Sequence, residues 1–161
     1  MHNTPAADEM TPAHSKRLGR ELAMEFLFAC ESKKELPGAA GFDLFLESVK
    51  EEFALDDNRT TRRGRDYAVR LYESVACDRE KIDGIIAAHC RNWDMDRISA
   101  VERNIMRVAV AEMLFFDDVP AVVSIDEAVG IARDFSGIEA GNFINGVLNS
   151  VKDSECPNDG R

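Results

Sequence analysis

The stretch SIDEAVGIARDFSGIEAGNFINGVLNSV, residues 124 to 151, decides the fold of this chain. It contains Asn145-Gly146 between apolar residues, which is a strong signal for a β-hairpin. The apolar residues around the dipeptide are instead spaced at i, i+4, i+5 and i+8, on one face of a helix: Phe143, Val147, Leu148 and Val151. The spacing predicts two short helices, with Gly146 inside the second. We expect Gly146 to permit close packing on the helix predicted over residues 98–116, with Asn145 hydrogen-bonded in the same contact.

Apolar periodicity predicts helices over most of the remaining chain, and no strand-like alternation of useful length occurs. The predicted helices cover residues 15–32, 42–53, 61–77, 79–92, 98–116, 124–136 and 140–152. A chain of 161 residues is long enough for one domain with a buried core. We therefore expect a single all-α domain over residues 14–152, folded as a compact bundle, with disordered tails at residues 1–13 and 153–161.

Two of these helices have marked N-termini, because Ser99-x-x-Glu102 and Ser124-x-x-Glu127 both fit the capping box. The helix over residues 98–116 is apolar almost all round, so it is expected to be the central, buried helix.

Glu112 lies within the apolar stripe of that helix, and a buried carboxylate needs hydrogen bonds. We expect it to accept them from backbone N–H groups in a loop around residues 122–125. A catalytic acid is the alternative, although the pattern places no second catalytic group beside it.

The composition argues against several classes of protein. No run of eighteen apolar residues and no N-terminal signal pattern occurs, so neither a membrane span nor secretion is predicted, and a cytoplasmic location is expected. The four cysteines form no CxxC pair, and the three histidines make no ligand spacing with them. We therefore expect reduced thiols, no metal site and no cofactor.

The charge is strongly acidic and segregated along the chain. The formal net charge of −10 argues against a protein that coats nucleic acid by bulk electrostatics, so any such contact must be local. Residues 42–57 hold six acidic residues against Lys50 alone. Residues 59–70 reverse this, with five arginines against Asp66. An ion pair between Arg62 and Asp66 on a solvated helix face explains most of this basic run, and RNA contact is the alternative.

The first predicted helix has an unusual second face. Its core stripe is formed by Leu18, Leu22, Ala23, Phe26 and Cys30. Four residues of the opposite face lie within about 80° of one another, with Lys16 beside them: Arg17, Arg20, Met24 and Phe28. Arginine and aromatic side chains on one surface fit phosphate contact and base stacking in single-stranded RNA. They also fit a protein interface or packing in the core, so the residues alone leave all three open.

With these features in place, the chain resembles the NusB family of bacterial transcription antitermination factors over nearly its whole ordered length. The matching segments are KRLGRELAMEFLFACE at residues 16–31, WDMDRISAVERNIMRVAVAEMLFFDDVP at 93–120, and the stretch at 124–151. The last is the most specific, because it carries the family's Phe-x-Asn-Gly-Val-Leu at residues 143–148. Residues 33–92 match in apolar pattern only.

The resemblance implies a bundle of about seven helices in two halves, near residues 14–77 and 78–152, and a protein that is not an enzyme. It implies a transcription antitermination factor that binds the boxA element of nascent ribosomal RNA together with NusE, a small-subunit ribosomal protein, in the transcription elongation complex. NusB-like proteins exist as monomers and as homodimers that cover the RNA face, so the resemblance leaves the oligomeric state open.

The resemblance also assigns RNA-binding roles to single residues. Arg17 and Arg20, in the pattern RxxRE, match the family's RNA-binding face, and Lys16 precedes them. Phe28 takes the family's aromatic position near both RNA and NusE. Asn142, at the start of the last helix, is expected on the same side as the arginines.

Partner contacts follow from the same resemblance. Glu102 matches an acidic residue that contacts NusE, so it would serve both as a capping residue and as a contact. Phe143 is expected close to Phe28 on the same composite surface.

Two departures from the family pattern weaken the RNA-binding half of this expectation. Leu18 stands where relatives often carry a third basic residue, and Asn142 stands where a lysine often precedes the phenylalanine. Each lost phosphate contact lowers RNA affinity, so the partner has to supply charge. A helical protein-interaction module with weak or no RNA binding is therefore the alternative. A fragment of an rRNA cytosine methyltransferase fits poorly, because no glycine-rich nucleotide loop occurs.

Overall fold

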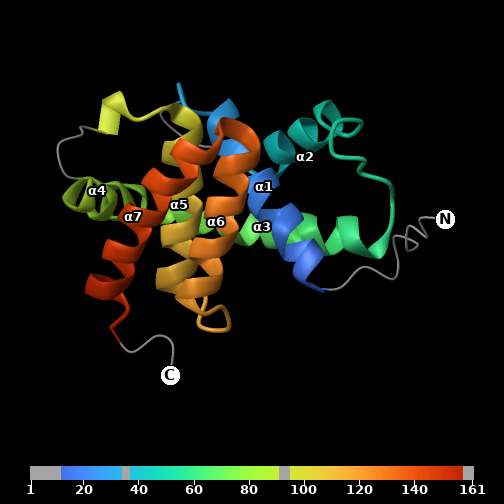
Figure 1. Ribbon diagram of the computed structural model, residues 1–161. Helices are drawn as coiled ribbons and strands as arrows, with labels where there is room; N and C mark the ends of the chain where they lie inside the picture. The colour runs from blue at the N-terminus through green and yellow to red at the C-terminus, as the bar shows by residue number, and fades with distance from the viewer. Residues whose placement is uncertain (1–11, 34–36, 91–94, 158–161) are drawn as a thin grey trace. The chain divides into compact units, whose positions relative to one another are not determined.

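The computed structural model describes residues 12–33, 37–90 and 95–157, and every regular element in these ranges is a helix (Figure 1). The helices are α1 Pro12–Ala29, α2 Ala39–Ser48, α3 Arg59–Cys77, α4 Arg79–His89, the short 3₁₀ turn η2 Met95–Arg97, α5 Ala100–Phe115, α6 Ala121–Ser136 and α7 Ile138–Glu155. The all-α prediction is confirmed, and each of the seven predicted helices is present. No described helix combines the length and apolar character that a membrane crossing requires.

The chain forms two compact units, residues 1–72 and 73–161, with the boundary inside α3. The first unit holds α1, α2 and most of α3, and the second holds α4 to α7. Helix α7 continues to Glu155, three residues into the segment expected to be a tail. Residues 1–11 and 158–161, expected to be disordered, lie outside the described residues.

Aromatic rings form the core of the first unit. The ring of Phe26 on α1 lies 5.1 Å from that of Phe42 on α2 and 5.0 Å from that of Tyr72 on α3, both in edge-to-face geometry. The rings of Phe42 and Tyr72 lie 5.0 Å apart. Edge-to-face pairs add stabilisation beyond the burial of their area, so this cluster joins all three helices of the unit.

A close approach of α1 and α3 accompanies the aromatic cluster. A Cβ atom added at Gly19 would lie 2.8 Å from the Tyr67 side chain and 2.9 Å from the Gly64 carbonyl oxygen. One added at Gly64 would lie 2.8 Å from Leu18 Cδ2 and 3.2 Å from the Ser15 carbonyl oxygen. Both glycines are therefore required by space, because any side chain at either position would push the helices apart.

Helix α5 is the buried centre of the second unit, as expected, with residues 104–113 all buried. Helices α6 and α7 lie beside it, and α4 packs on α5 and α7 (Figure 1). Arg107 is buried on α5 and is paired with Asp83 on α4 through two hydrogen bonds of 2.7 and 3.0 Å. A bidentate pair of this kind fixes the orientation of one helix on the other.

The two predicted capping boxes have different outcomes. Ser99 is the N-cap of α5 and accepts a hydrogen bond from the Glu102 backbone N–H at 3.2 Å, so this cap is confirmed. The box at Ser124 is wrong, because α6 begins one turn earlier, after Pro120, whose φ of −59° suits a helix start. Ser124 is instead buried inside α6 and donates to Glu112 Oε1 at 2.6 Å. A hydroxyl within α6 is thus one partner of Glu112, and the expected hydrogen bonds from backbone N–H groups around residues 122–125 stay a prediction.

Helix α7 confirms one prediction about Asn145-Gly146 and corrects two. The dipeptide lies inside the helix, as predicted. Gly146 is exposed, however, and a Cβ there would meet nothing within 4 Å, so it makes no close packing contact. Asn145 is also exposed and accepts hydrogen bonds from Asn149 Nδ2 of the next turn at 2.9 and 3.1 Å. The rotation of α7 about its axis explains both corrections. Residues 145 and 146 lie outside the buried face, which is formed by Ile144, Val147, Leu148 and Val151.

Substituting Gly146→Ala should stabilise the protein. The residue is helical, exposed and unhindered, so alanine only removes backbone entropy from the unfolded chain, and the free energy of unfolding should rise by about 0.5–1 kcal/mol. Urea denaturation measures this change. Gly137→Ala is the contrasting variant, since Gly137 has φ of 96° and alanine there is strained. A loss of stability in Gly146→Ala would show that the position is packed.

Substituting Gly19→Ala should destabilise the protein by about 1–3 kcal/mol, because the added methyl group overpacks the contact with Tyr67. Gly84→Ala is the matched control, since Gly84 lies inside α4 and its Cβ would meet nothing within 4 Å. Thermal unfolding of both variants measures the difference. Equal stability of the two would contradict a close α1–α3 approach.

Candidate nucleic-acid interface

The basic residues of α1 come before any acidic residue in the helix, and its first turn carries no acid. Arg17 donates from Nε to Glu21 Oε1 at 2.8 Å, an i, i+4 pair that holds the guanidinium at the helix surface. Its side chain retains 29% of its accessible surface. Arg17 is therefore positioned by its own helix and still reaches solvent.

Tyr67 of α3 gathers three cations in the first unit. Its ring is buried, with Lys16 Nζ 5.8 Å, Arg20 Cζ 5.7 Å and Arg70 Cζ 5.8 Å from the ring centroid. Cations are attracted to the faces of aromatic rings within about 6 Å. Two of the predicted site residues, Lys16 and Arg20, are thus brought together by a ring that the sequence analysis did not single out.

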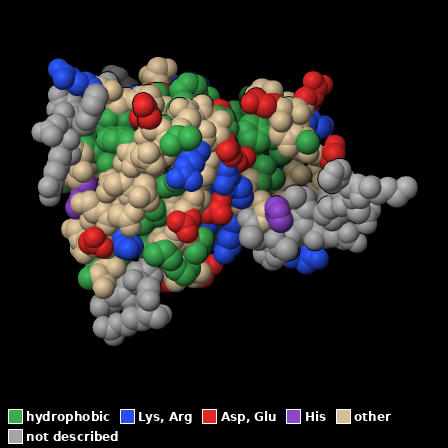
Figure 2. All heavy atoms as spheres, viewed as in Figure 1, with side chains coloured by type: hydrophobic (Ala, Val, Ile, Leu, Met, Phe, Trp, Pro, Cys, Tyr) green, Lys and Arg blue, Asp and Glu red, His purple; other side chains and the backbone are tan. Residues whose placement is uncertain are grey.

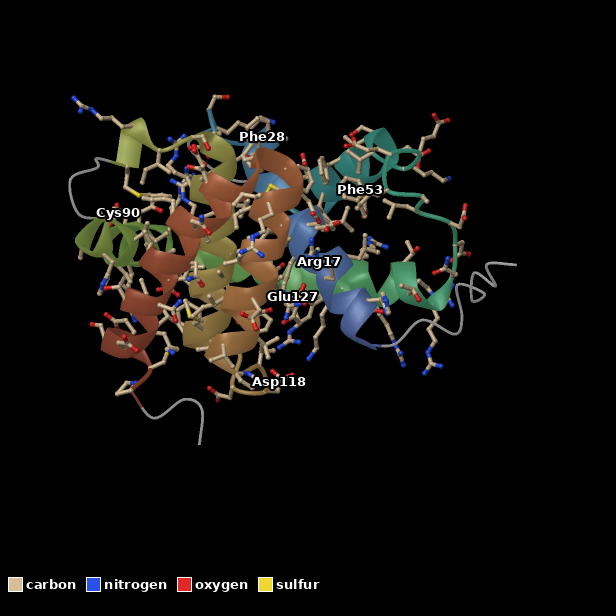
Figure 3. The ribbon with its side chains drawn as sticks, viewed as in Figure 1. Arg17, Phe28, Phe53, Cys90, Asp118 and Glu127 are labelled. Carbon is tan, nitrogen blue, oxygen red and sulfur yellow. The ribbon has the colours of Figure 1, made fainter. Side chains whose placement is uncertain are left out.

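The sequence predicts one shared surface on α1, formed by the residues opposite its core stripe. The structure does not show one continuous exposed surface there. Arg20 and Met24 are buried, with 4% and 1% of their surface exposed. Arg17 and Phe28 remain accessible, and Phe28 is 43% exposed (Figure 3). Because α-helices rise 1.5 Å per residue, these two lie about 16 Å apart along the axis. α1 therefore presents a basic position and, three turns later, an exposed aromatic ring.

Ion pairs connect the acidic stretch to the arginine run of α3. Arg62 pairs with Asp57 at 2.7 Å, and Arg65 pairs with Asp43. The recorded partner of Arg62 is therefore Asp57, where Asp66 was expected. In the view of Figure 2, basic and acidic side chains are interspersed, with hydrophobic ones between them. Two of the six acids of residues 42–57 thus neutralise part of the run that follows them.

Burial raises the pKa values of three groups in the part of the chain that the structure describes. Burial is the main cause for Glu25 on α1, and the charges of Glu52 and Glu21 raise its pKa further. Burial also raises the pKa of the Cys30 and Cys90 thiols, which disfavours the reactive thiolate. Among the described residues, no group of three or more histidine, cysteine or acidic side chains could hold a metal ion.

The remaining predicted site residues lie in the second unit. Glu102 is half-buried in the first turn of α5, and the group that bonds to Ser99 is its backbone N–H. Asn142 is exposed and Phe143 half-buried near the start of α7. The contact expected between Phe143, of the second unit, and Phe28, of the first, stays a prediction.

The fold is that of solved antitermination factors. The chain superposes on NusB of T. maritima with a TM-score of 0.68 and 31% identity, covering 88% of this chain and 93% of that one. It also superposes on a chain of the crystal structure of the antitermination factors NusB and NusE in complex with dsRNA, with a TM-score of 0.70 and 27% identity, covering 87% and 97%.

The chain belongs to the NusB family, whose model matches residues 17–153. A relative from Desulfotalea psychrophila, the transcription antitermination protein NusB, is 42% identical over 137 residues, which are 85% of this chain and 94% of that protein. The NusB resemblance read from the sequence is confirmed.

Proposed function

We propose that this NusB-family protein is a cytoplasmic transcription antitermination factor that binds the boxA RNA of nascent rRNA transcripts as a complex with NusE. It acts within the transcription elongation complex by binding and catalyses no reaction. The proposal rests on the accessibility of two residues of α1. Arg17 and Phe28 both reach solvent, at separate positions along the helix. A related chain solved with NusE and dsRNA supports both partners.

The basic residues of α1 have different roles in RNA binding. Arg17 is accessible and pre-oriented by Glu21, so it contacts a phosphate directly. Arg20 is buried against Tyr67 and acts through the positive potential that it adds and through the position that it gives Tyr67. Lys16 lies over the same ring and is half-buried, so it can reach a second phosphate.

The aromatic and acidic positions serve the protein partner and the bases. Phe28 offers an exposed ring for stacking or for an apolar contact with NusE. Glu102 presents its carboxylate to a basic residue of NusE, because its backbone alone makes the cap. Asn142 and Phe143, near the start of α7, are further candidate contacts for RNA and NusE.

The acidic balance explains why the complex, and not the free protein, is the RNA-binding species. A net charge of −10 repels a polyanion over the whole surface, so the few local cations have to overcome it. A basic partner adds charge beside the site. Free protein should therefore bind boxA RNA weakly and the NusE complex tightly.

A helical protein-interaction module without RNA binding is the second candidate function. The ion pair between Arg17 and Glu21 favours it, since that guanidinium is already partly neutralised, and Asn142 lacks the charge of a lysine. Co-purification of NusE without RNA would select this candidate.

Arg17→Ala should lower the affinity of the NusE complex for boxA RNA severalfold. It should also reduce the slope of log affinity against log salt by about 0.7, the value for one phosphate contact on a single strand. Fluorescence anisotropy at several salt concentrations measures both. Arg62→Ala removes the same charge from a side chain paired with Asp57, so it serves as control. An unchanged slope for Arg17→Ala would exclude a direct phosphate contact.

Glu102→Gln should weaken NusE binding about tenfold or more, the loss that follows removal of one partner of a buried charge pair. It should change the free energy of unfolding by less than about 0.5 kcal/mol, because the side chain is not the recorded capping group. Ser99→Ala should do the reverse, lowering stability by about 1 kcal/mol and leaving NusE binding intact. Titration calorimetry and urea denaturation separate the two. Parallel losses in both variants would mean that Glu102 acts only through helix stability.

A further inference from the structure

We propose that α3 carries a second RNA-contacting surface, an arginine stripe formed by Arg59, Arg63 and Arg70, which binds backbone phosphates and continues the basic surface of α1. This inference rests on the proposed function. It assigns a role to the arginine run, which the sequence left open between a solvated face and an RNA contact.

The five arginines of the run separate into two sets on the helix. At 100° per residue, Arg59, Arg63 and Arg70 fall within about 40° of one another. Arg62 and Arg65 lie outside this sector and are the two that pair with Asp57 and Asp43. Among the residues that the structure describes, no ion pair is recorded for Arg59 or Arg63. The acidic stretch therefore pairs with Arg62 and Arg65, and Arg59 and Arg63 of the stripe lie outside these ion pairs.

Tyr67 connects the stripe to α1 within the first unit. Arg70 and Lys16 both lie 5.8 Å from the centroid of this ring, one from each helix. The close approach at Gly19 and Gly64 brings the helices together at the same place. The two cations are therefore at most twice 5.8 Å apart, so one strand of RNA that contacts Lys16 can also contact Arg70.

The position of the stripe in α3 is unfavourable for the helix itself. Arg59 and Arg62 lie in its first turn, which carries no acidic residue, and Arg63 directly follows it. Cations there oppose the helix macrodipole, whose N-terminal end is positive. The start is stabilised instead by Asn58, whose Oδ1 accepts from the Thr61 backbone N–H at 2.9 Å. The cations at this position lower the stability of the helix, and their presence fits a role in binding an anionic ligand.

The chemistry of the stripe favours RNA over a membrane or a protein partner. Guanidinium groups bind phosphates through paired hydrogen bonds. No large hydrophobic side chain of α3 is exposed, so the stripe lacks the apolar residues that a membrane surface or the centre of a protein interface uses. The stripe extends about 16 Å from Arg59 to Arg70, since the helix rises 1.5 Å per residue, and this length can contact several successive phosphates.

The test is a set of charge-matched variants bound to NusE and titrated with boxA RNA over a range of salt. The double variant Arg63→Gln/Arg70→Gln should lower affinity about tenfold or more and reduce the salt slope by about 1.4, for two phosphate contacts. Arg62→Gln/Arg65→Gln removes equal charge from the paired set and should leave the slope unchanged. Arg63→Lys/Arg70→Lys keeps the charge and should recover the slope. Asp66→Asn, which removes the acid beside the stripe, should raise affinity about two- to threefold.

Several outcomes would overturn the proposal that the stripe contacts RNA. Equal losses of RNA affinity in the two glutamine double variants would show that the arginines act through net charge and not through direct phosphate contacts. An unchanged slope for Arg63→Gln/Arg70→Gln, with Arg17→Ala still impaired, would reject the stripe and leave the proposed function standing. Loss of NusE binding in that double variant would make the stripe a protein contact. A parent complex that binds no boxA RNA would reject the proposed function and the stripe together.

Discussion

The approach of α1 to α3 is the contact on which the described surface of the first unit depends. Two glycines from different helices leave room for it, and Tyr67 and Leu18 fill the space that side chains at those glycines would occupy. The same contact brings Lys16 and Arg20 of one helix and Arg70 of the other to a single ring. A packing constraint thereby determines where positive charge collects on a chain with a net charge of −10.

Much of the fold could be predicted from the sequence, because helix periodicity is a local property. The seven helices and the Ser99 cap follow from spacing and from capping chemistry within a few residues. The Ser124 cap could not be predicted, because Pro120 starts the helix earlier and Glu112, twelve positions before Ser124, takes its hydroxyl. Likewise the rotation of α7, which leaves Gly146 in solvent, depends on which face its neighbours cover. Tertiary contacts decide these positions, and no local pattern records them.

The candidate site divides in the same way. Lys16, Arg17, Arg20 and Phe28 were placed on one helix from periodicity and family resemblance, yet nothing in their spacing reveals that Arg20 is buried and Phe28 exposed. Tyr67 was missed because its role arises from a helix crossing between residues about fifty positions apart. The signal that could have found it is the glycine of each helix, Gly19 and Gly64, set among basic residues where no turn is expected.

The ion pairs between the acidic stretch and α3 have a consequence for selectivity. Cells contain a large excess of RNA that is not a target, and the useful quantity for an RNA-binding protein is the ratio of specific to non-specific binding. Arg62 and Arg65, paired with Asp57 and Asp43, present less net positive charge to a polyanion than unpaired arginines would. By pairing these two arginines with its own acids, the chain lowers competition from non-target RNA. Discrimination between target and non-target RNA is then left to the few cations that helix packing positions.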